Sequence, residues 1–137
     1  MLWLPANRIE DVLPLSGLRN LKYLTVAHNE IADISPVASL RNLEGLAIGG
    51  NDIKDISALR SLNQLKNLDL AENPIDDFTP LKSLTNLELL SMHQVDHDEL
   101  RLILRAALPH NDVKVNWTPS GADWWQVQKG AISTLTE

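Results

Sequence analysis

The chain has 137 residues, of which 44% are apolar, and it carries a formal net charge of −6 with a pI of about 5.1. This length fits one domain with an apolar core, and the acidic balance argues against nucleic acid as a partner, because phosphate binding needs clustered lysine and arginine. No cysteine is present, which excludes disulfides and thiolate chemistry, and no apolar run approaches the roughly 18 residues of a membrane helix, so membrane insertion is not expected.

The N-terminal segment, residues 1–7, has the pattern of a strand, with Leu2 and Leu4 expected in the core and Trp3 on the opposite face. It lacks the basic start and the long apolar run of a secretory signal. The compartment therefore stays open between the cytoplasm and, for a longer protein, the cell surface or the medium. No capping element precedes this strand, and an open strand edge favours pairing, so we expect something to cover it.

From Leu18 to Thr85 the sequence repeats with a period of 22 residues, and apolar side chains fall in fixed columns. Two of the columns are leucine, one is mixed aliphatic and one is isoleucine. They comprise Leu21, Leu43, Leu65 and Leu87; Leu24, Leu46, Leu68 and Leu90; Val26, Ile48, Leu70 and Met92; and Ile31, Ile53 and Ile75. A fixed short period with apolar columns is the signature of a solenoid, in which each repeat is one turn of a stacked coil.

An asparagine closes the expected strand of each unit. The column comprises Asn7, Asn29, Asn51 and Asn73. A buried asparagine can bond backbone groups of the neighbouring turn, so we predict a structural role for it. The chain then returns through short turns that start with Ser or Thr followed by Pro or Ala, which favours an N-cap and a first helical residue. The starts are Ser35-Pro36, Ser57-Ala58 and Thr79-Pro80, and each turn is short enough to be a 3₁₀ helix.

The last unit departs from the pattern, because Val95 stands where the asparagine would be. Asp96 is expected to cap a longer helix. The apolar stripe of this helix comprises Leu100, Ile103, Leu104, Ala107 and Leu108. Pro109 ends it, and the alternation over residues 113–117 predicts a closing strand. Residues 118–137 fit no repeat, and we expect a linker followed by a tail with a short helix over 122–134.

The pattern LxxLxLxxNxI with a period of 22, followed by D-[IVF]-x-P-[LV]xxL, resembles the short leucine-rich repeats of bacterial internalins and phosphatase-regulator proteins. The resemblance covers residues 2–117. It implies an α/β fold, a right-handed leucine-rich repeat solenoid shaped as a horseshoe segment, with a parallel sheet on the concave face, short 3₁₀ or helical turns on the convex face, and a C-terminal helix–strand cap. We expect the repeat domain over 1–117, with a partial first repeat, repeats to about 95 and the cap over 96–117, and a linker and tail over 118–137.

Two clusters have residue types that bind metals. The first comprises His93, Asp96, His97, Asp98 and Glu99. Its spacing is not that of a zinc motif, and acids at a helix start are explained by capping and the helix dipole. The second is an acidic column that comprises Asp11, Asp33, Asp55, Asp77 and Glu99. A calcium ladder would use such carboxylates, but bonding to backbone amides at each turn start explains them more simply. We therefore predict no metal and no cofactor.

Catalysis is not expected either. His28 near Asp69 or Glu72 has the residue types of an acid–base pair, but no nucleophile and no glycine-rich phosphate loop accompanies them. The segment Asn116-Trp117-Thr118 is a glycosylation sequon, for which chance occurrence is the simpler interpretation in an array of bacterial type.

The remaining candidate surface is the concave face, on which the strand residues that alternate with the core project. Its centre carries small residues, one flank is aromatic and the other is acidic. The predicted partner-binding residues are Trp3, Tyr23, Thr25, His28, Gly45, Ala47, Asn67, Asp69, Glu72, Leu89, Ser91 and His93. Exposed aromatic residues on a rigid sheet are typical of a protein interface.

The sequence therefore predicts a non-catalytic protein–protein interaction module that binds a protein partner on its concave face. One alternative is a structural or self-assembling segment of a longer bacterial surface or secreted protein. Such a segment would form homo-oligomers through its uncapped N-terminal end or through the tail that carries Trp124 and Trp125. Another alternative is a regulatory domain appended to an enzyme.

Overall fold

The computed structural model describes residues 1–92, 98–110, 112–116 and 132–134. Short strands alternate with 3₁₀ turns, and an α-helix and two strands follow. The strands are β1 (Leu2–Trp3), β2 (Tyr23–Thr25), β3 (Gly45–Ala47), β4 (Asn67–Asp69), β5 (Leu89–Ser91), β6 (Lys114–Asn116) and β7 (Ile132–Thr134). The 3₁₀ turns are η1 (Leu13–Leu15), η2 (Ser35–Ser39), η3 (Ser57–Ser61) and η4 (Thr79–Ser83), and the helix is α1 (Asp98–Ala107).

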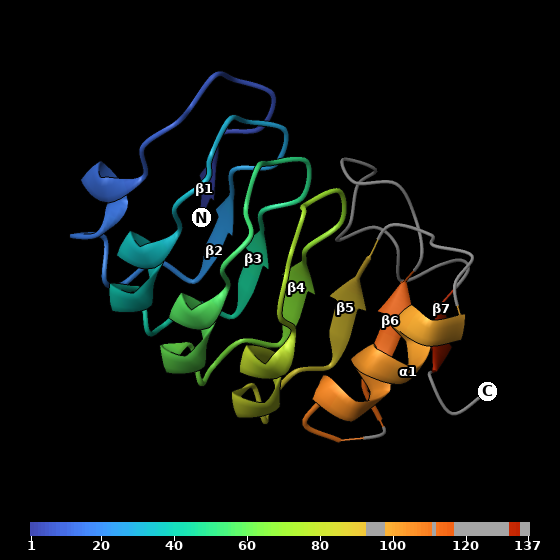
Figure 1. Ribbon diagram of the computed structural model, residues 1–137. Helices are drawn as coiled ribbons and strands as arrows, with labels where there is room; N and C mark the ends of the chain where they lie inside the picture. Colours follow the sequence, from blue (N-terminus) through green and yellow to red (C-terminus); the bar gives the residue numbers. More distant parts are fainter. Residues whose placement is uncertain (93–97, 111, 117–131, 135–137) are drawn as a thin grey trace.

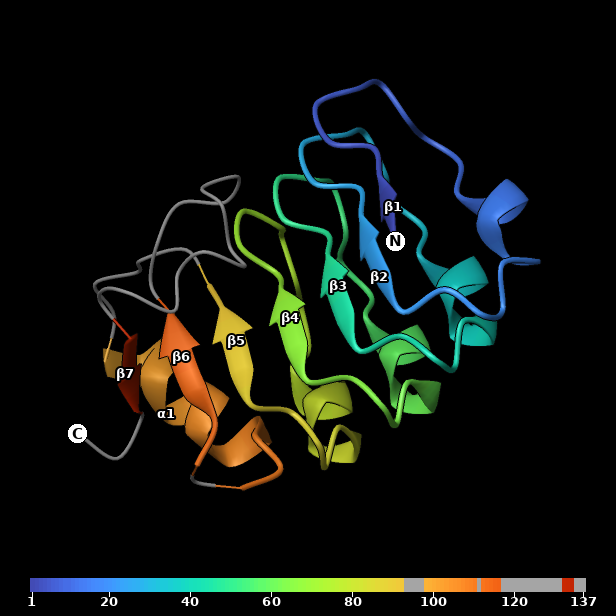
Figure 2. The same ribbon diagram turned by 180° about the vertical axis from the view of Figure 1, so that it is seen from behind.

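The sheet follows the order of the chain. Strands β1 to β6 are parallel neighbours, and β7 pairs antiparallel with β6. As far as β5 the register joins residues one period apart, so Leu46 pairs with Leu68 and Leu68 with Leu90. Figures 1 and 2 show the strands side by side in one curved row and the 3₁₀ turns stacked in a second row. This arrangement confirms the predicted solenoid, with its sheet on one side and its short turns on the other.

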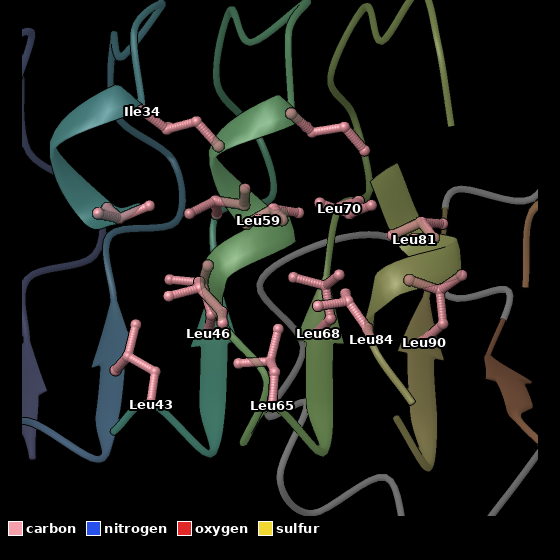
Figure 3. Packing of buried hydrophobic residues seen from close by; sticks show 14 of the residues in the cluster. Ile34, Leu43, Leu46, Leu59, Leu65, Leu68, Leu70, Leu81, Leu84 and Leu90 are labelled. Atoms are coloured by element: carbon pink, nitrogen blue, oxygen red, sulfur yellow. The ribbon is translucent and has the colours of Figure 1, made fainter. Parts of the chain in front are cut away.

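The core lies between these two rows, where leucines from strands and turns meet (Figure 3). Leu46 and Leu68 from the strands and Leu59 and Leu81 from the turns have no exposed surface. The predicted apolar columns are therefore confirmed from the second repeat onward. Leu18, where the regular repeats begin, is 45% exposed while Leu40 one period later is buried, because within this chain the turn of Leu18 has a neighbour on one side only.

The asparagine column forms a ladder of side-chain hydrogen bonds between successive repeats. The Oδ1 atoms of Asn29, Asn51 and Asn73 accept the N–H groups of Ile9, Ile31 and Ile53 at 3.0–3.1 Å. Each Nδ2 group donates to backbone carbonyls in its own repeat and in the preceding one, as Asn51 does to Ile48 and Val26. The structural role predicted for the asparagines is therefore confirmed for Asn29, Asn51 and Asn73, whereas Asn7 is exposed and bonds only carbonyls of its own repeat.

The acidic column has the structural role that the sequence favoured. The Oδ1 atoms of Asp11, Asp33, Asp55 and Asp77 each accept the N–H two residues later, at 2.8–2.9 Å. The prediction that Ser or Thr would be the N-cap is wrong. Ser35, Ser57 and Thr79 are instead the first residues of their turns, and their own N–H groups donate to the aspartates two residues earlier.

The C-terminal elements match the predicted helix and closing strand, α1 and β6. Ala107 and Leu108 are buried as expected. Ile103 is 48% exposed, because it lies at a surface hollow that Phe78 also lines. Ile132–Thr134 forms β7 instead of the end of a helix, because β-branched residues favour a strand and the free edge of β6 offers hydrogen bonds. Val95, Asp96 and most of the tail lie outside the described residues.

Candidate functional site: the concave face of the sheet

The parallel register arranges most of the predicted site residues in two rows across the sheet. The first row follows the starts of the strands and comprises Tyr23, Gly45, Asn67 and Leu89. The second row follows the strand ends and comprises Trp3, Thr25, Ala47, Asp69 and Ser91. The structure therefore brings these residues together on one face, as the sequence predicted, while His93 lies outside the described residues.

The two rows differ in how much surface they expose. Trp3 and Tyr23 are 46% and 41% exposed, and Asn67 and Leu89 are partly exposed. The rest of the strand-end row is buried, with exposed fractions of 4% or less at Thr25, Ala47, Asp69 and Ser91. The sequence led us to expect solvent-facing side chains there. The methyl group of Ala47 is flanked at the same register by the larger Thr25 and Asp69, so the small centre is not an open surface.

Two buried polar groups in this row lack a full set of hydrogen bonds. Burial raises the pKa of Asp69 to about 6 from 3.8, although the Ala71 N–H donates to its Oδ1 at 3.0 Å and His28 also opposes the rise. Next to it in the register, the Oγ atom of Ser91 has no hydrogen-bond partner among the described residues. Burial of the Asp69 carboxylate outweighs both the Ala71 N–H and His28, so the approach of a further positively charged group is favoured.

Tyr23 is held by a charged cluster that the sequence analysis did not identify. Its hydroxyl donates to Oε2 of Glu44 at 3.4 Å, and Glu44 forms ion pairs with Lys22 at 3.4 Å and Lys66 at 3.6 Å. Burial alone would raise the pKa of Glu44, but the two lysines hold it below its ordinary value. The alternation Lys22, Glu44, Lys66 at one repeat position is the signal that would have revealed this cluster.

The residue before each asparagine has a left-handed backbone, which was also not predicted. The φ angles are 54° at Ala6, His28 and Glu72, and 67° at Gly50. Only glycine adopts this conformation readily, so Gly50 was the one visible signal in the column. A Cβ atom at Gly50 would overlap the imidazole of His28, which therefore lies against the next repeat at the rim of the concave face.

The face offers recognition chemistry: exposed aromatic rings, a buried acid and a rim with His28 and Glu72. Within the part of the chain that the structure describes, no group of three or more His, Cys, Asp or Glu residues is placed to hold a metal ion. Among the same residues, no helix has both the length and the apolar character needed to cross a membrane.

Comparison with known proteins supports the repeat assignment. A family model described as leucine-rich repeats, two copies, matches residues 41–83. An internalin from Listeria monocytogenes is 28% identical, with a TM-score of 0.68 over 83% of this chain and 33% of its own. Internalin C2 from the same species is 36% identical, with a TM-score of 0.64 over 81% of this chain and 48% of its own. No curated protein sequence matches the chain.

A leucine-rich repeat protein from Leptospira interrogans is 20% identical, with a TM-score of 0.60 over 83% of this chain and 37% of its own, and it shows the shared fold alone. The chain spans between a third and about half of the length of these three structures. Together with the period, the asparagine ladder and the parallel sheet, these similarities identify the repeats. The chain folds as a leucine-rich repeat solenoid that is similar to those of internalins.

Proposed function

We propose that the chain is a non-catalytic interaction module that binds a protein partner on its concave face. The observation that carries the proposal is the pair of exposed aromatic side chains on this face, Trp3 and Tyr23. Aromatic residues of this kind are the usual anchors of protein interfaces, and curved repeat arrays commonly bind partners on an extended inner surface. The Glu44 cluster positions the Tyr23 ring before binding, which reduces the entropy lost on association.

The acidic groups indicate which partner surface would fit beside these anchors. Asp69 is buried and Glu72 is exposed at the rim, so a lysine or arginine of the partner would find a carboxylate on this side of the face. Ala47 is fully buried and does not contribute a contact in this arrangement. The contact surface we propose therefore runs from Trp3 and Tyr23 across Asn67 to the acidic rim.

Site-specific photocrosslinking tests the proposal. A photoreactive residue at Asn67 should capture a partner from a bacterial lysate, whereas the same residue at Leu13, which is 60% exposed on the turn side, should not. With the captured partner purified, Tyr23→Ala should weaken binding by at least about 1 kcal/mol, or about fivefold. Leu13→Ala is the matched control and should leave the affinity unchanged. Equal capture at both positions, or an unchanged affinity of Tyr23→Ala, would reject the concave site.

Self-association is a second candidate, because β1 pairs with a neighbour on one side only within this chain. Met1 is 75% exposed, and Leu2 and Leu4 are only partly buried beside this edge. Homo-oligomers formed through this edge would show a mass that rises with concentration in light scattering. Leu2→Lys should abolish that rise, and a constant monomer mass in the parent would dismiss this candidate.

A further inference from the structure

A second surface with binding chemistry lies away from the concave face, at the turns that lead into β2 and β3. A hollow with a volume of about 410 Å³ is lined there by Arg19, Ser39, Arg41 and Asn42. The two arginines occupy the same position in consecutive repeats, so they rise from adjacent turns of the solenoid. Figure 1 shows these turns one after the other along the edge where the strands begin.

The backbone that carries the two arginines is fixed by hydrogen bonds between the repeats. The Nδ2 group of Asn42 donates to the carbonyl of Arg19 at 2.8 Å, and the Oγ of Ser39 donates to the carbonyl of Ser16 at 2.7 Å. Both bonds use main-chain acceptors, so neither needs an arginine side chain. The turns are consequently held in place while the two guanidinium groups stay available.

The fold does not require positive charge at these positions. In the next repeats the equivalent residues are Asn63 and Thr85, and the same type of bond recurs there from Asn86 to the carbonyl of Asn63 at 2.7 Å. Within the described residues, neither the Arg19 nor the Arg41 side chain forms an ion pair or a hydrogen bond. Two adjacent, exposed and unpaired arginines in a chain of net charge −6 therefore lack a structural explanation.

We propose that Arg19 and Arg41 form a binding site for a phosphate group. Guanidinium groups present planar forks of donors that match the oxygens of phosphate, and each fork can bond two of them. A tetrahedral dianion has enough oxygens to bond both forks at once, whereas one fork already satisfies a single carboxylate. The ligand is thus free phosphate or a phosphate monoester, and the site is independent of the concave face.

Titration of the ¹⁵N-labelled full chain with inorganic phosphate, with ionic strength held constant by potassium chloride, tests this site by NMR. Saturable shifts should appear at the Nε–H groups of Arg19 and Arg41 and at the backbone of residues 39–42, at roughly millimolar phosphate. The double variant Arg19→Gln, Arg41→Gln should bind at least about tenfold more weakly. It should melt at the parent temperature, because both side chains are exposed and unbonded.

The matched control is the double variant Arg8→Gln, Lys54→Gln, which removes the same charge from exposed positions elsewhere and should keep parental phosphate binding. A parallel titration with glycerol 3-phosphate distinguishes the two sources. Tighter binding of the ester would assign the site to phosphorylated molecules, and equal or weaker binding would assign it to free phosphate. The proposal is overturned if potassium chloride alone produces the same shifts, or if both double variants lose binding equally.

Discussion

Replacing Asn51 with alanine tests how much one step of the asparagine ladder contributes to stability. Asn51 is 6% exposed, accepts the Ile31 N–H at 3.0 Å, and donates to the carbonyls of Val26, Ile48 and Gly49 at 3.1, 2.9 and 3.3 Å. In Asn51→Ala all four bonds are lost. The consequence differs between the groups, because the carbonyls have other partners and the Ile31 N–H does not.

The three carbonyls stay bonded after the substitution. Val26 still accepts from Asn29 at 2.9 Å, Ile48 from Asn73 at 2.8 Å, and Gly49 from the His28 N–H at 2.8 Å. The Ile31 N–H is left buried without a partner, which costs about 1–3 kcal/mol. With a smaller contribution from the lost second bonds to the carbonyls, we expect Asn51→Ala to lower the free energy of unfolding by about 2–4 kcal/mol.

Urea unfolding followed by circular dichroism measures this loss, and Asn7→Ala is the matched control. Asn7 is exposed, its Oδ1 accepts no N–H group among the described residues, and its Nδ2 bonds only carbonyls of its own repeat. The Asn7 variant should therefore lose no more than about 0.5 kcal/mol, as surface substitutions do. If the two variants unfold at the same urea concentration, the orphaned Ile31 N–H does not determine the effect and the reasoning fails.

Three further substitutions test the core, the left-handed column and the buried acid. Leu68→Ala removes a side chain with no exposed surface and should cost about 2–5 kcal/mol, seen as a lower urea midpoint. Gly50→Ala should cost about 1–2 kcal/mol, because φ is 67° and the new Cβ meets the His28 ring; in a His28→Ala background the cost should fall to the backbone strain alone. Asp69 has a folded-state pKa of about 6, above its ordinary 3.8, so its ionisation destabilises the fold at high pH and this effect disappears as the pH falls below 4. The free energy of unfolding of Asp69→Asn should therefore exceed that of the parent by about 1–3 kcal/mol at pH 7.5, and the two should be equal at pH 3.5. A difference that does not change with pH would contradict the raised pKa of Asp69.

The repeat architecture could be predicted because the same physical requirement recurs every 22 residues. A leucine is needed wherever a strand faces the core, and an asparagine wherever a strand ends beside an unbonded amide. The end of the asparagine ladder was also visible in the sequence, because a valine side chain at position 95 has no oxygen atom to accept the Ile75 N–H. In the structure that N–H donates instead to the carbonyl of Asn73 at 2.9 Å. Such features depend on local pattern, which the sequence contains directly.

The candidate site was predictable only in outline. Alternation along the strands places Thr25, Ala47 and Asp69 on the concave side, but the exposed fraction of a side chain depends on its lateral neighbours in three dimensions. For the same reason the role of Glu44 was missed: it binds lysines one repeat away on either side, which no local window connects. The N-cap prediction failed differently, because each Ser or Thr is the first residue of its turn and donates its N–H to the aspartate two residues earlier.

Internal repetition also separates positions where the fold requires one residue type from positions where it allows several. Asparagine recurs in four successive units, and the bonds between repeats require it at Asn29, Asn51 and Asn73. The strand-end row of the concave face changes instead from Trp3 to Thr25, Ala47, Asp69 and Ser91. The turn position of Arg19 and Arg41 changes to Asn and Thr in the next two units, while the bond that fixes the turn recurs. Where the residue at a repeat position changes while the surrounding backbone hydrogen bonds recur, the stability of the fold does not determine which residue stands there. The aromatic residues of the concave face and the two neighbouring arginines meet this condition, and each can therefore be replaced without unfolding the solenoid. Loss of binding in such a variant, with an unchanged melting temperature, would report on recognition alone.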